Sequence, residues 1–418
     1  MPARKRFSAK MCFFIGVRKE TRPERDRDGP AQPLSTVDRG RAHLQINSEM
    51  KAWIRDAAQR LGFDLCGIAL AELDVRNRKA YQQWLEHGFQ GEMAYMARPE
   101  RQDLRRVLPS VRSVICVGMV YNTAQPLSIE SNDPDRGWIA RYAWGDDYHA
   151  IMQERLEQLL AKLRAAVAQP FDARVYVDTG PVLERAVAWA AGLGWVAKNT
   201  CLINEQLGSW FFLGEILTSL ELEPDEPVWD RCGTCTRCLD ACPTGALVEP
   251  YVLDATRCIS YHTIELKGVI PEEHRPAMGR HVFGCDICQD VCPWNREAVA
   301  TSLPEFQLRP LPEPESGTPQ MPRTAFNPPL DVLAKLSEEH FQSLFQKSPI
   351  RRAKQRGFLR NVAVAMGNSR QEKFRPLLES LAEHSDPLIR EHALWALHHL
   401  DQTTHADKAI LTSPGRVP

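Results

Sequence analysis

Three long apolar stretches in the first half of the chain have the pattern of buried strands. They are rich in β-branched and aromatic residues, and they cover residues 111–121 (VRSVICVGMVY), 174–178 (RVYVD) and 210–220 (WFFLGEILTSL). Between them, apolar side chains recur at helical spacing over residues 150–167 and 183–191. The alternation predicts an α/β domain.

The last third of the chain has a different pattern. Beyond about residue 330 it is rich in Ala and Leu, and residues 358–366 and 376–400 predict antiparallel helices. Ser385-Asp386-Pro387 predicts a turn between two of them. This pattern is similar to HEAT-type helical repeats. The eight prolines of residues 304–329 are typical of an extended linker or a wrapping segment.

The start of the chain mixes Arg and Lys with Pro, Gly and Ser, which buries too little apolar surface to fold alone. We predict a disordered basic extension here, for which an RNA-binding arm is the alternative. A helical pattern opens at Met50, a second candidate for the translation start. We therefore expect six segments: the extension at 1–47, an α/β domain at 48–225, a cysteine-rich domain at 226–298, a Pro-rich linker at 299–330, a HEAT-like helical domain at 331–405 and a tail at 406–418.

Composition narrows the class of protein without deciding its function. A chain of 418 residues is too long for one ordinary core. Its 43% hydrophobic and 25% charged residues are those of a soluble globular protein. The net charge of -1 gives no protein-wide attraction for nucleic acid, so RNA binding would need a local basic patch. No apolar run is long enough to span a bilayer or act as a signal peptide, which predicts a cytoplasmic protein without a membrane partner.

Eight of the twelve cysteines lie between residues 232 and 292. Disulfide frameworks suit small secreted domains, so metal ligation is the better account in this long chain. The first run is C-x2-C-x2-C-x3-C-P, typical of two-cluster ferredoxins, in which the fourth cysteine binds the other cluster. A shorter copy, C-x2-C-x3-C-P, begins at Cys285, and Cys258 supplies its missing ligand. The spacing predicts two [4Fe–4S] clusters, one bound by Cys232, Cys235, Cys238 and Cys292 and the other by Cys242, Cys258, Cys285 and Cys288.

Two alternatives for the cysteines carry less weight. Zinc sites also use C-x2-C pairs, but two C-P endings and one complementing cysteine favour clusters. Four cysteines fall outside the sets. Of these, Cys66 and Cys116 fit buried small hydrophobic residues, and the remaining two are Cys12 and Cys201.

Four separated motifs resemble the epoxyqueuosine reductases. They are RYAWGDDYH from Arg141, VDTGPVLERAVAWAAGLGWVAKN from Val177, RCISYHTIE from Arg257 and FGCDICQDVCPWN from Phe283. The resemblance runs from about residue 48 to about 400. It implies a multidomain α/β protein with a cobalamin-binding domain, a ferredoxin-like two-cluster domain and a HEAT-like domain. The implied reaction is the last step of queuosine formation, in which epoxyqueuosine at the tRNA wobble position loses its epoxide oxygen. The implied cofactors are cobalamin and the clusters, since a reduced corrinoid provides the hard chemistry.

The resemblance also assigns roles to individual residues. Asp178 matches the proton donor, which would need a raised pKa beside an apolar corrin. From the bare sequence, Asp178 or Thr179 could instead cap a helix that starts at Pro181. The positions matching corrinoid contacts are Arg101, Asn199, Leu202, Leu213, Ser260 and Asp286, and those matching tRNA contacts are Arg185 and Asn204. Asp286 lies between two cluster ligands, which places the corrin beside the second cluster.

Two departures concern the corrinoid. Asp147-Tyr148-His149 matches part of the D-x-H-x-x-G motif that supplies a cobalt ligand in some corrinoid enzymes, but Met152 replaces its glycine. The resembled family binds cobalamin without such a histidine, so we expect Asp147 and Tyr148 to shape the substrate pocket. Ala140 stands where some relatives carry a cysteine near cobalt, and a mechanism that requires that thiol cannot operate here.

A local basic patch follows the linker. Residues 348–361 (SPIRRAKQRGFLRN) predict phosphate contacts that position RNA without reading its sequence, through Arg351, Arg352, Lys354, Arg356 and Arg360. A solvated start of a helix is the alternative.

Three functions compete at this stage. The first is epoxyqueuosine reduction by a monomer that receives electrons from an external low-potential flavodoxin or ferredoxin. The second is a corrinoid iron–sulfur reductase of small molecules, similar to the reductive dehalogenases, although these carry an export signal. The third is a ferredoxin-like electron-transfer subunit, which leaves the α/β domain unexplained.

Overall fold

The structure, a computed structural model, describes residues 37–308 and 324–412, with side chains described from 48 to 308 and from 324 to 402. Residues 1–36 of the expected extension and 413–418 of the expected tail lie outside these ranges, and the last described helix continues into the expected tail as far as Thr412. Helix α1 (Val37–Arg60) begins well before Met50, where we expected the first helix. No proline interrupts residues 37–49, so nothing in the sequence forbids the earlier start.

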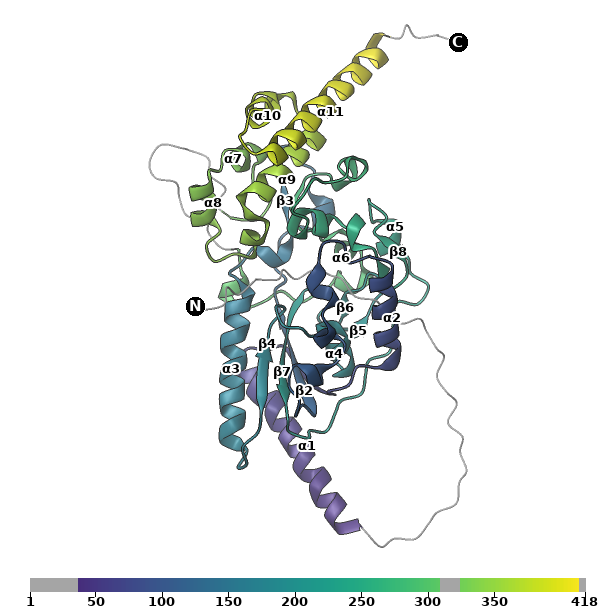
Figure 1. The fold of residues 1–418 in the computed structure, drawn as a ribbon, viewed down its shortest axis with the longest axis vertical. Coiled ribbons are helices and arrows are strands. Elements are labelled where there is room, and N and C mark those ends of the chain that lie inside the picture. Colours follow the sequence, from purple (N-terminus) through teal and green to yellow (C-terminus); the bar gives the residue numbers. More distant parts are fainter. Residues whose placement is uncertain (1–36, 309–323, 413–418) are drawn as a thin grey trace.

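A four-stranded sheet organises the first half of the molecule (Figure 1). Its order is β1-β2-β7-β4, with strands β1 (Leu65–Leu70), β2 (Ser113–Val120), β4 (Ala173–Tyr176) and β7 (Phe211–Thr218). All three pairings are antiparallel. The three predicted strands are thereby confirmed, whereas β1 was not predicted.

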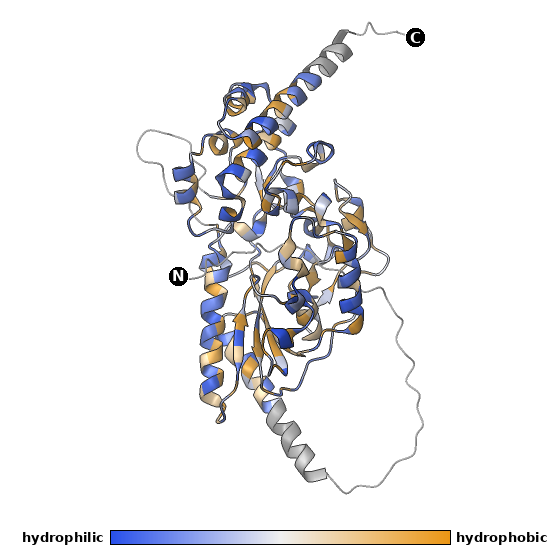
Figure 2. Cartoon of the chain, viewed as in Figure 1, coloured by the Kyte–Doolittle hydropathy of each residue, from blue (hydrophilic) through white to orange (hydrophobic). Residues whose placement is uncertain are grey.

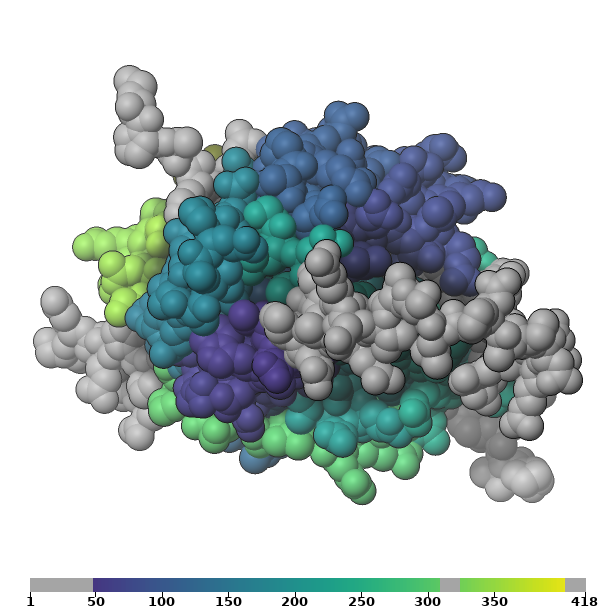
Figure 3. All heavy atoms as spheres, turned by 90° about the horizontal axis from the view of Figure 1, so that it is seen from below, coloured from purple at the N-terminus to yellow at the C-terminus, as the bar shows by residue number. Residues whose placement is uncertain are grey.

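Both faces of the sheet are covered, which explains the unbroken apolar runs. Successive side chains of a strand point to opposite faces, so alternate residues of β2 enter two separate hydrophobic clusters. One cluster includes residues of α1 and α3 (Tyr148–Ala166), and the other includes residues of α2 (Val75–Glu86) and α4 (Glu184–Ala190). Figure 2 shows the apolar central strands between helices with mixed surfaces, and Figure 3 shows α1 beside α3 at the lower end of the molecule.

A close approach fixes β1 against the end of α4. A Cβ atom at Gly67 would lie 2.0 Å from the carbonyl oxygen of Ala191, so only glycine fits. The contact holds α4 on the face of the sheet that carries the candidate site.

The cysteine-rich region consists of short elements joined by loops. They are α5 (Arg237–Asp240), β8 (Leu247–Glu249), β9 (Val252–Leu253), β10 (His281–Phe283) and α6 (Ile287–Asp290). The short pair β5 (Trp195–Val196) and β6 (Leu202–Ile203) precedes this region, in the α/β part. A single π-helical turn, η7 (Tyr261–Glu265), follows Cys258. Strand β10 pairs in parallel with β3 (Trp138–Ile139), which fastens the cysteine-rich region to the α/β part.

The C-terminal helices are α7 (Leu330–Ala334), α8 (Glu338–Leu344), α9 (Lys354–Ser369), α10 (Arg375–Ala382) and α11 (Pro387–Thr412). The two predicted helices and the turn between α10 and α11 are confirmed. Apolar side chains of α8 and α9 belong to the same hydrophobic cluster as α1 and α3. The segments that we expected as separate domains therefore share a continuous core.

The expected linker is packed at both ends. Phe306 and Leu330 are buried, and Glu305 forms an ion pair with Arg155 of α3 at 2.7 Å. Its middle, residues 309–323, lies outside the described residues. Within the described part of the chain, none of the helices combines the length and apolar character that a membrane span requires.

Candidate active site

The first predicted set of cluster ligands surrounds one cavity. Cys232, Cys235, Cys238 and Cys292 border a cavity of about 370 Å³. The ammonium group of Lys198 donates to the carbonyls of Gly233 and Cys235, both at 2.8 Å, and so fixes the loop. Burial, and then the neighbouring thiols, raise the pKa of Cys238 to about 12. Such thiols ionise only beside a strong positive charge, so this set fits the iron of a cluster.

Three members of the second predicted set, Cys242, Cys258 and Cys285, lie near one another. Burial and then the thiol of Cys258 hold the pKa of Cys285 well above its usual value, and Cys242 adds to the effect. Cys242, Cys258 and Cys288 pack against the same hydrophobic cluster. The all-sulfur composition of this set likewise fits an iron–sulfur cluster.

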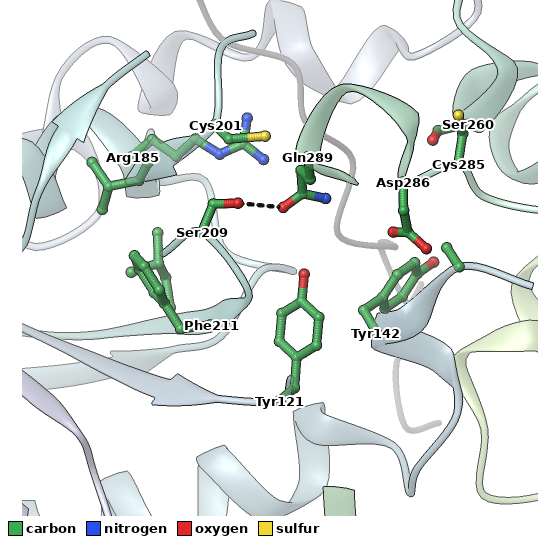
Figure 4. A pocket seen from close by; sticks show the side chains of 13 residues that line it. Tyr121, Tyr142, Arg185, Cys201, Ser209, Phe211, Ser260, Cys285, Asp286 and Gln289 are labelled. Atoms are coloured by element: carbon green, nitrogen blue, oxygen red, sulfur yellow. Dashed lines mark hydrogen bonds between the residues drawn. The ribbon is translucent and has the colours of Figure 1, made fainter. Parts of the chain in front are cut away.

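A second cavity, of about 510 Å³, lies between the sheet and the second cysteine set. Four of the six residues predicted to contact the corrinoid line it: Leu202, Leu213, Ser260 and Asp286. Figure 4 shows Ser209 hydrogen-bonded to Gln289 on one side of this cavity and Tyr142 near Asp286 on the other. Cys285 also lines the cavity, which therefore reaches a predicted cluster ligand.

The cavity wall mixes apolar and polar side chains, and it includes one unsatisfied polar group. The hydroxyl of Tyr142 is buried and has no hydrogen-bond partner among the described residues. Buried polar groups normally have partners, so a bound group is expected to contact this hydroxyl. A wall that mixes apolar side chains with several polar groups can hold a large cofactor that has both kinds of surface, such as a corrinoid. Ala140 and Cys201 also lie on the wall.

Asp286 is held by rigid neighbours. Its Oδ2 accepts from the backbone N–H of Arg141 at 2.8 Å and from the indole of Trp138 at 3.1 Å. Burial raises the pKa of Asp286, and these two donors oppose the rise. Both donors flank the end of β3, whose pairing with β10 therefore sets the position of this carboxyl group.

The other two predicted corrinoid contacts do not line the cavity. The guanidinium of Arg101 is buried and donates to the carbonyl of Val182 at 3.0 Å. The amide of Asn199 donates to the carbonyl of Cys288 at 3.1 Å, so it supports a cysteine loop.

Asp178 follows β4 and has an unusual backbone conformation, with φ of 54°. Its Oδ2 accepts from the hydroxyl of Tyr148 at 2.9 Å and faces Nε2 of His149 at 3.3 Å. The capping alternative is wrong, because α4 begins only at Glu184 and Leu183 at its N-cap makes no side-chain capping bond. Because the sheet is antiparallel, the edge rule for parallel sheets does not explain this position of Asp178.

His149 lies between two carboxylates. Its Nδ1 is 2.7 Å from Oδ1 of Asp147, and its Nε2 is the atom that faces Asp178. Burial alone would lower the pKa of His149, but the two carboxylates raise it to about 10. His149 is therefore an imidazolium at neutral pH, with both nitrogens engaged. Asp147 also caps α3 by accepting from the backbone N–H of His149.

Sequence reasoning missed two carboxyl groups behind Asp178. The backbone N–H of Asp178 donates to Oε1 of Glu184. Glu215 pairs in register with Tyr176, is fully buried, and has a pKa held well above its usual value by burial and by Glu184. The available signal was a single acidic residue inside the apolar run WFFLGEILTSL.

The two residues predicted to contact tRNA from the α/β part are engaged within the protein. Arg185 is buried, donates to the carbonyl of Thr200 at 2.9 Å and lines the larger cavity. Asn204 orders its own turn by accepting from the backbone N–H groups of Gln206 and Leu207.

The predicted basic patch divides into exposed and buried members. Arg351, Lys354 and Arg356 are exposed. Arg352 forms a two-point ion pair with Glu265, at 2.9 and 2.7 Å. Arg360 is buried and donates to the carbonyls of His262, Leu266 and Gly268. A phosphate contact would require an arginine that faces solvent, and Arg360 does not.

Asn361 continues the support that Arg360 gives to the cysteine-rich region. Its amide nitrogen donates to the carbonyls of Thr263 and Val282, both at 2.9 Å. Those two residues follow Cys258 and precede Cys285, so α9 clamps the segments that carry two cysteines of the second set.

Two parts of the chain match known protein families. Residues 101–179 match a family model described as "Epoxyqueuosine reductase QueG, DUF1730", and residues 231–295 match one described as "4Fe-4S double cluster binding domain". The epoxyqueuosine reductase of Xanthomonas campestris pv. campestris is 42% identical over 84% of this chain and 96% of its own. That of Escherichia coli is 41% identical over 84% of this chain and 89% of its own.

The chain belongs to the epoxyqueuosine reductase family. Among solved structures, an epoxyqueuosine reductase with a tRNA-Tyr epoxyqueuosine-modified stem loop has a TM-score of 0.75 at 30% identity, covering 88% of this chain and 96% of its own. The Bacillus subtilis family member, described with its aspartate catalytic loop swung out of the active site, has a TM-score of 0.73 at 29% identity over the same shares. The mixed helix–strand fold with a double-cluster domain is therefore that of the epoxyqueuosine reductases.

Proposed function

We propose that this chain reduces epoxyqueuosine to queuosine in tRNA. The observation that carries the proposal is a convergence of two kinds of group on one region. Cys285 and Asp286 line the larger cavity together with Tyr142, and the Tyr142 ring lies against that of Tyr148, whose hydroxyl donates to Asp178. Electrons arriving through the cysteine sets and a proton held at Asp178 would therefore meet at the same substrate.

The larger cavity is the proposed site for cobalamin. Leu202, Leu213, Ser260 and Asp286 would contact it from the wall, and Tyr142 would offer its unpaired hydroxyl. When bound, the corrinoid supplies the strongly reducing metal that an unactivated epoxide requires. Arg101 and Asn199 would act one layer further out, because they hold the backbone at Val182 and Cys288.

The chain's own residues perform the remaining tasks. Asp178 is the proposed proton donor to the epoxide oxygen, and Tyr148 orients it. The two cysteine sets are the proposed ligands of the two [4Fe–4S] clusters, which an external low-potential donor would reduce.

The tRNA is proposed to bind along the exposed part of the basic patch. Arg351 and Lys354 offer positive charge for phosphate contacts, and Arg356 is exposed beside them while it pairs with Asp386. Asp147 lies close to this patch. Burial would raise the pKa of Asp147, but its contacts with His149 lower it, and the positive charge of Arg351 adds a smaller lowering effect. The expected division into α/β, cysteine-rich and HEAT-like helical units stands as part of this proposal.

Anaerobic reconstitution tests the function. The protein is loaded with iron, sulfide and cobalamin, reduced chemically, and given tRNA that carries epoxyqueuosine. Queuosine is measured by mass spectrometry of the digested tRNA. We expect product only when both clusters and corrinoid are present; a chain that retains no corrinoid, or that retains it without forming queuosine, would refute the proposal.

The RNA surface has its own test. Arg351→Gln with Lys354→Gln should weaken tRNA binding several-fold and flatten its salt dependence. The control is Arg112→Gln, which removes an exposed arginine that precedes β2 and pairs with Glu221. Equal affinity in the double variant and the control would contradict this placement.

A further inference from the structure

Removal of an epoxide oxygen consumes two protons, and Asp178 carries at most one. In the proposed reaction both C–O bonds of the epoxide break, a C=C bond forms, and the oxygen leaves as water. The two electrons come from a low-potential one-electron donor acting twice. The second proton needs its own source within the site, or Asp178 has to be protonated again before turnover is complete.

His149 is placed to return a proton to Asp178. Its Nε2 lies 3.3 Å from Oδ2 of Asp178, the same oxygen that accepts from Tyr148. Its Nδ1 is held at 2.7 Å by Asp147, which fixes the ring and favours a proton on each nitrogen. The ring is also stacked on Tyr148, with centroids 4.1 Å apart. These contacts aim one N–H at Asp178 and leave the ring little freedom to turn away.

The charges around His149 favour the imidazolium. Asp147 faces it from the start of α3, Asp178 from the end of β4, and Arg351 lies near Asp147 from the other side. Tyr148 neighbours it in the chain, and the Glu184–Glu215 pair lies behind Asp178. Asp147, together with Asp178 once Asp178 has given up its proton, dominates this set and raises the pKa of His149 to about 10 despite its burial.

We propose that His149 is a proton-relay residue that acts through Asp178 and supplies the second proton of each turnover. This inference rests on the proposed function. Asp178 gives its proton to the epoxide oxygen and becomes a carboxylate. When the second C–O bond breaks, the strongly basic leaving oxygen takes a proton through Asp178, and in the same step the Nε2 proton of His149 moves to Asp178, which leaves neutral imidazole. Solvent returns both protons after water and queuosine tRNA have formed. Because His149 touches Asp178 and not the substrate, it is a positioning residue as well as a proton store.

The test compares His149→Gln with wild type in single turnovers of chemically reduced, reconstituted enzyme between pH 6 and 10. Glutamine keeps a hydrogen-bond donor but holds no transferable proton. We expect the rate at pH 7 to fall by about 10- to 100-fold, with unchanged iron content and tRNA affinity. The wild-type rate should fall as pH approaches 10. The rate of the variant should not show this decline at alkaline pH. The control is His340→Gln, an exposed residue of α8, which should behave as wild type.

Two further measurements separate a relay from a merely structural role. In His149→Ala, added imidazole should restore part of the rate, because it can occupy the vacated space between the two carboxylates. In denaturant titrations, the stabilising effect of His149 should be present at pH 7 and decline as pH rises through about 10, since the folded pKa lies above the unfolded one. The gap in unfolding midpoint between wild type and His149→Gln should therefore narrow with rising pH.

The outcomes distinguish the two proposals. A wild-type enzyme that forms queuosine, together with a His149→Gln variant of equal rate and the same alkaline limb, would overturn the relay alone. Loss of rate that imidazole does not restore, with both pH profiles of the same shape, would also overturn it. No queuosine from wild type under any of these conditions would overturn the proposed function itself.

Discussion

The candidate site has an Asp178 side, formed by Tyr148, His149 and Asp178, and an Asp286 side, formed by Trp138, Arg141 and Asp286. Each side presents one carboxyl group with two donors. The donors to Asp286 are an indole and a backbone amide, which do not titrate in the working range of pH. Those to Asp178 are a phenol and an imidazolium, which can exchange protons. The difference indicates that the Asp286 side holds geometry and the Asp178 side moves protons.

The largest effect should come from breaking the Asp178 side. Asp178→Asn keeps the shape of the side chain but removes the acid, so we expect turnover to fall by about 10²- to 10⁴-fold. Cluster content and corrinoid retention should stay unchanged, as measured by iron assay and absorption spectra. Near-normal turnover would contradict the division between the two sides.

A smaller, structural effect should follow from Arg360→Met in α9, which supports the segment that follows Cys258. The variant leaves the carbonyls of His262, Leu266 and Gly268 without this donor. The loss of buried hydrogen bonds should lower the free energy of unfolding by about 3 kcal/mol. Iron retained after chelation should also fall; Lys354→Met, an exposed residue at the start of the same helix, is the control. If both variants keep equal iron, α9 does not support the second cysteine set.

Asp286→Leu should destabilise the protein by about 2 kcal/mol, because the amide of Arg141 and the indole of Trp138 lose their acceptor. Corrinoid binding should weaken with it. Asp286→Asn retains an acceptor oxygen and should restore most of both properties, as measured by thermal unfolding and by corrinoid titration. The opposite ranking of the two variants would show that the charge of Asp286 matters more than its hydrogen bonds.

The smallest effect is expected for Glu215→Gln. Burial and the neighbouring Glu184 hold the pKa of Glu215 well above its usual value, which favours the uncharged acid. An amide of the same shape should change the free energy of unfolding by less than about 1 kcal/mol. Turnover should stay within a few-fold of wild type. A large loss of activity would place Glu215 in the proton path and extend the Asp178 side to β7.

The strands and helices with strong local patterns were predictable from the sequence, and their spatial relations were not. The apolar runs that form β2 and β7 could be predicted as strands because helices cover both faces of the sheet, so nearly every residue of these strands is apolar. Their antiparallel pairing is set by chain connections that leave no local signal. Asp178 could be placed after a strand, whereas its contact with His149 depends on how α3 packs against the sheet.

The basic patch shows a second limit of sequence reasoning. Arg356 and Arg360 are four residues apart on one helix and look equivalent in the sequence. Only the partners of Arg360, which lie more than 90 residues earlier, decide that it points inward. Local charge predicts a patch, and long-range packing selects which of its members reach solvent.

The clamp formed by Asn361 has a consequence for how the protein is made. The ribosome releases residues 258 and 285 long before it releases α9, so the carbonyls of Thr263 and Val282 emerge without their later partner. Until α9 is made, the segments around Thr263 and Val282 lack the two hydrogen bonds from Asn361 that hold them together. We expect the second cluster to be inserted only after synthesis is almost complete, so that a chain stopped before residue 354 would be a poor acceptor of iron and sulfide.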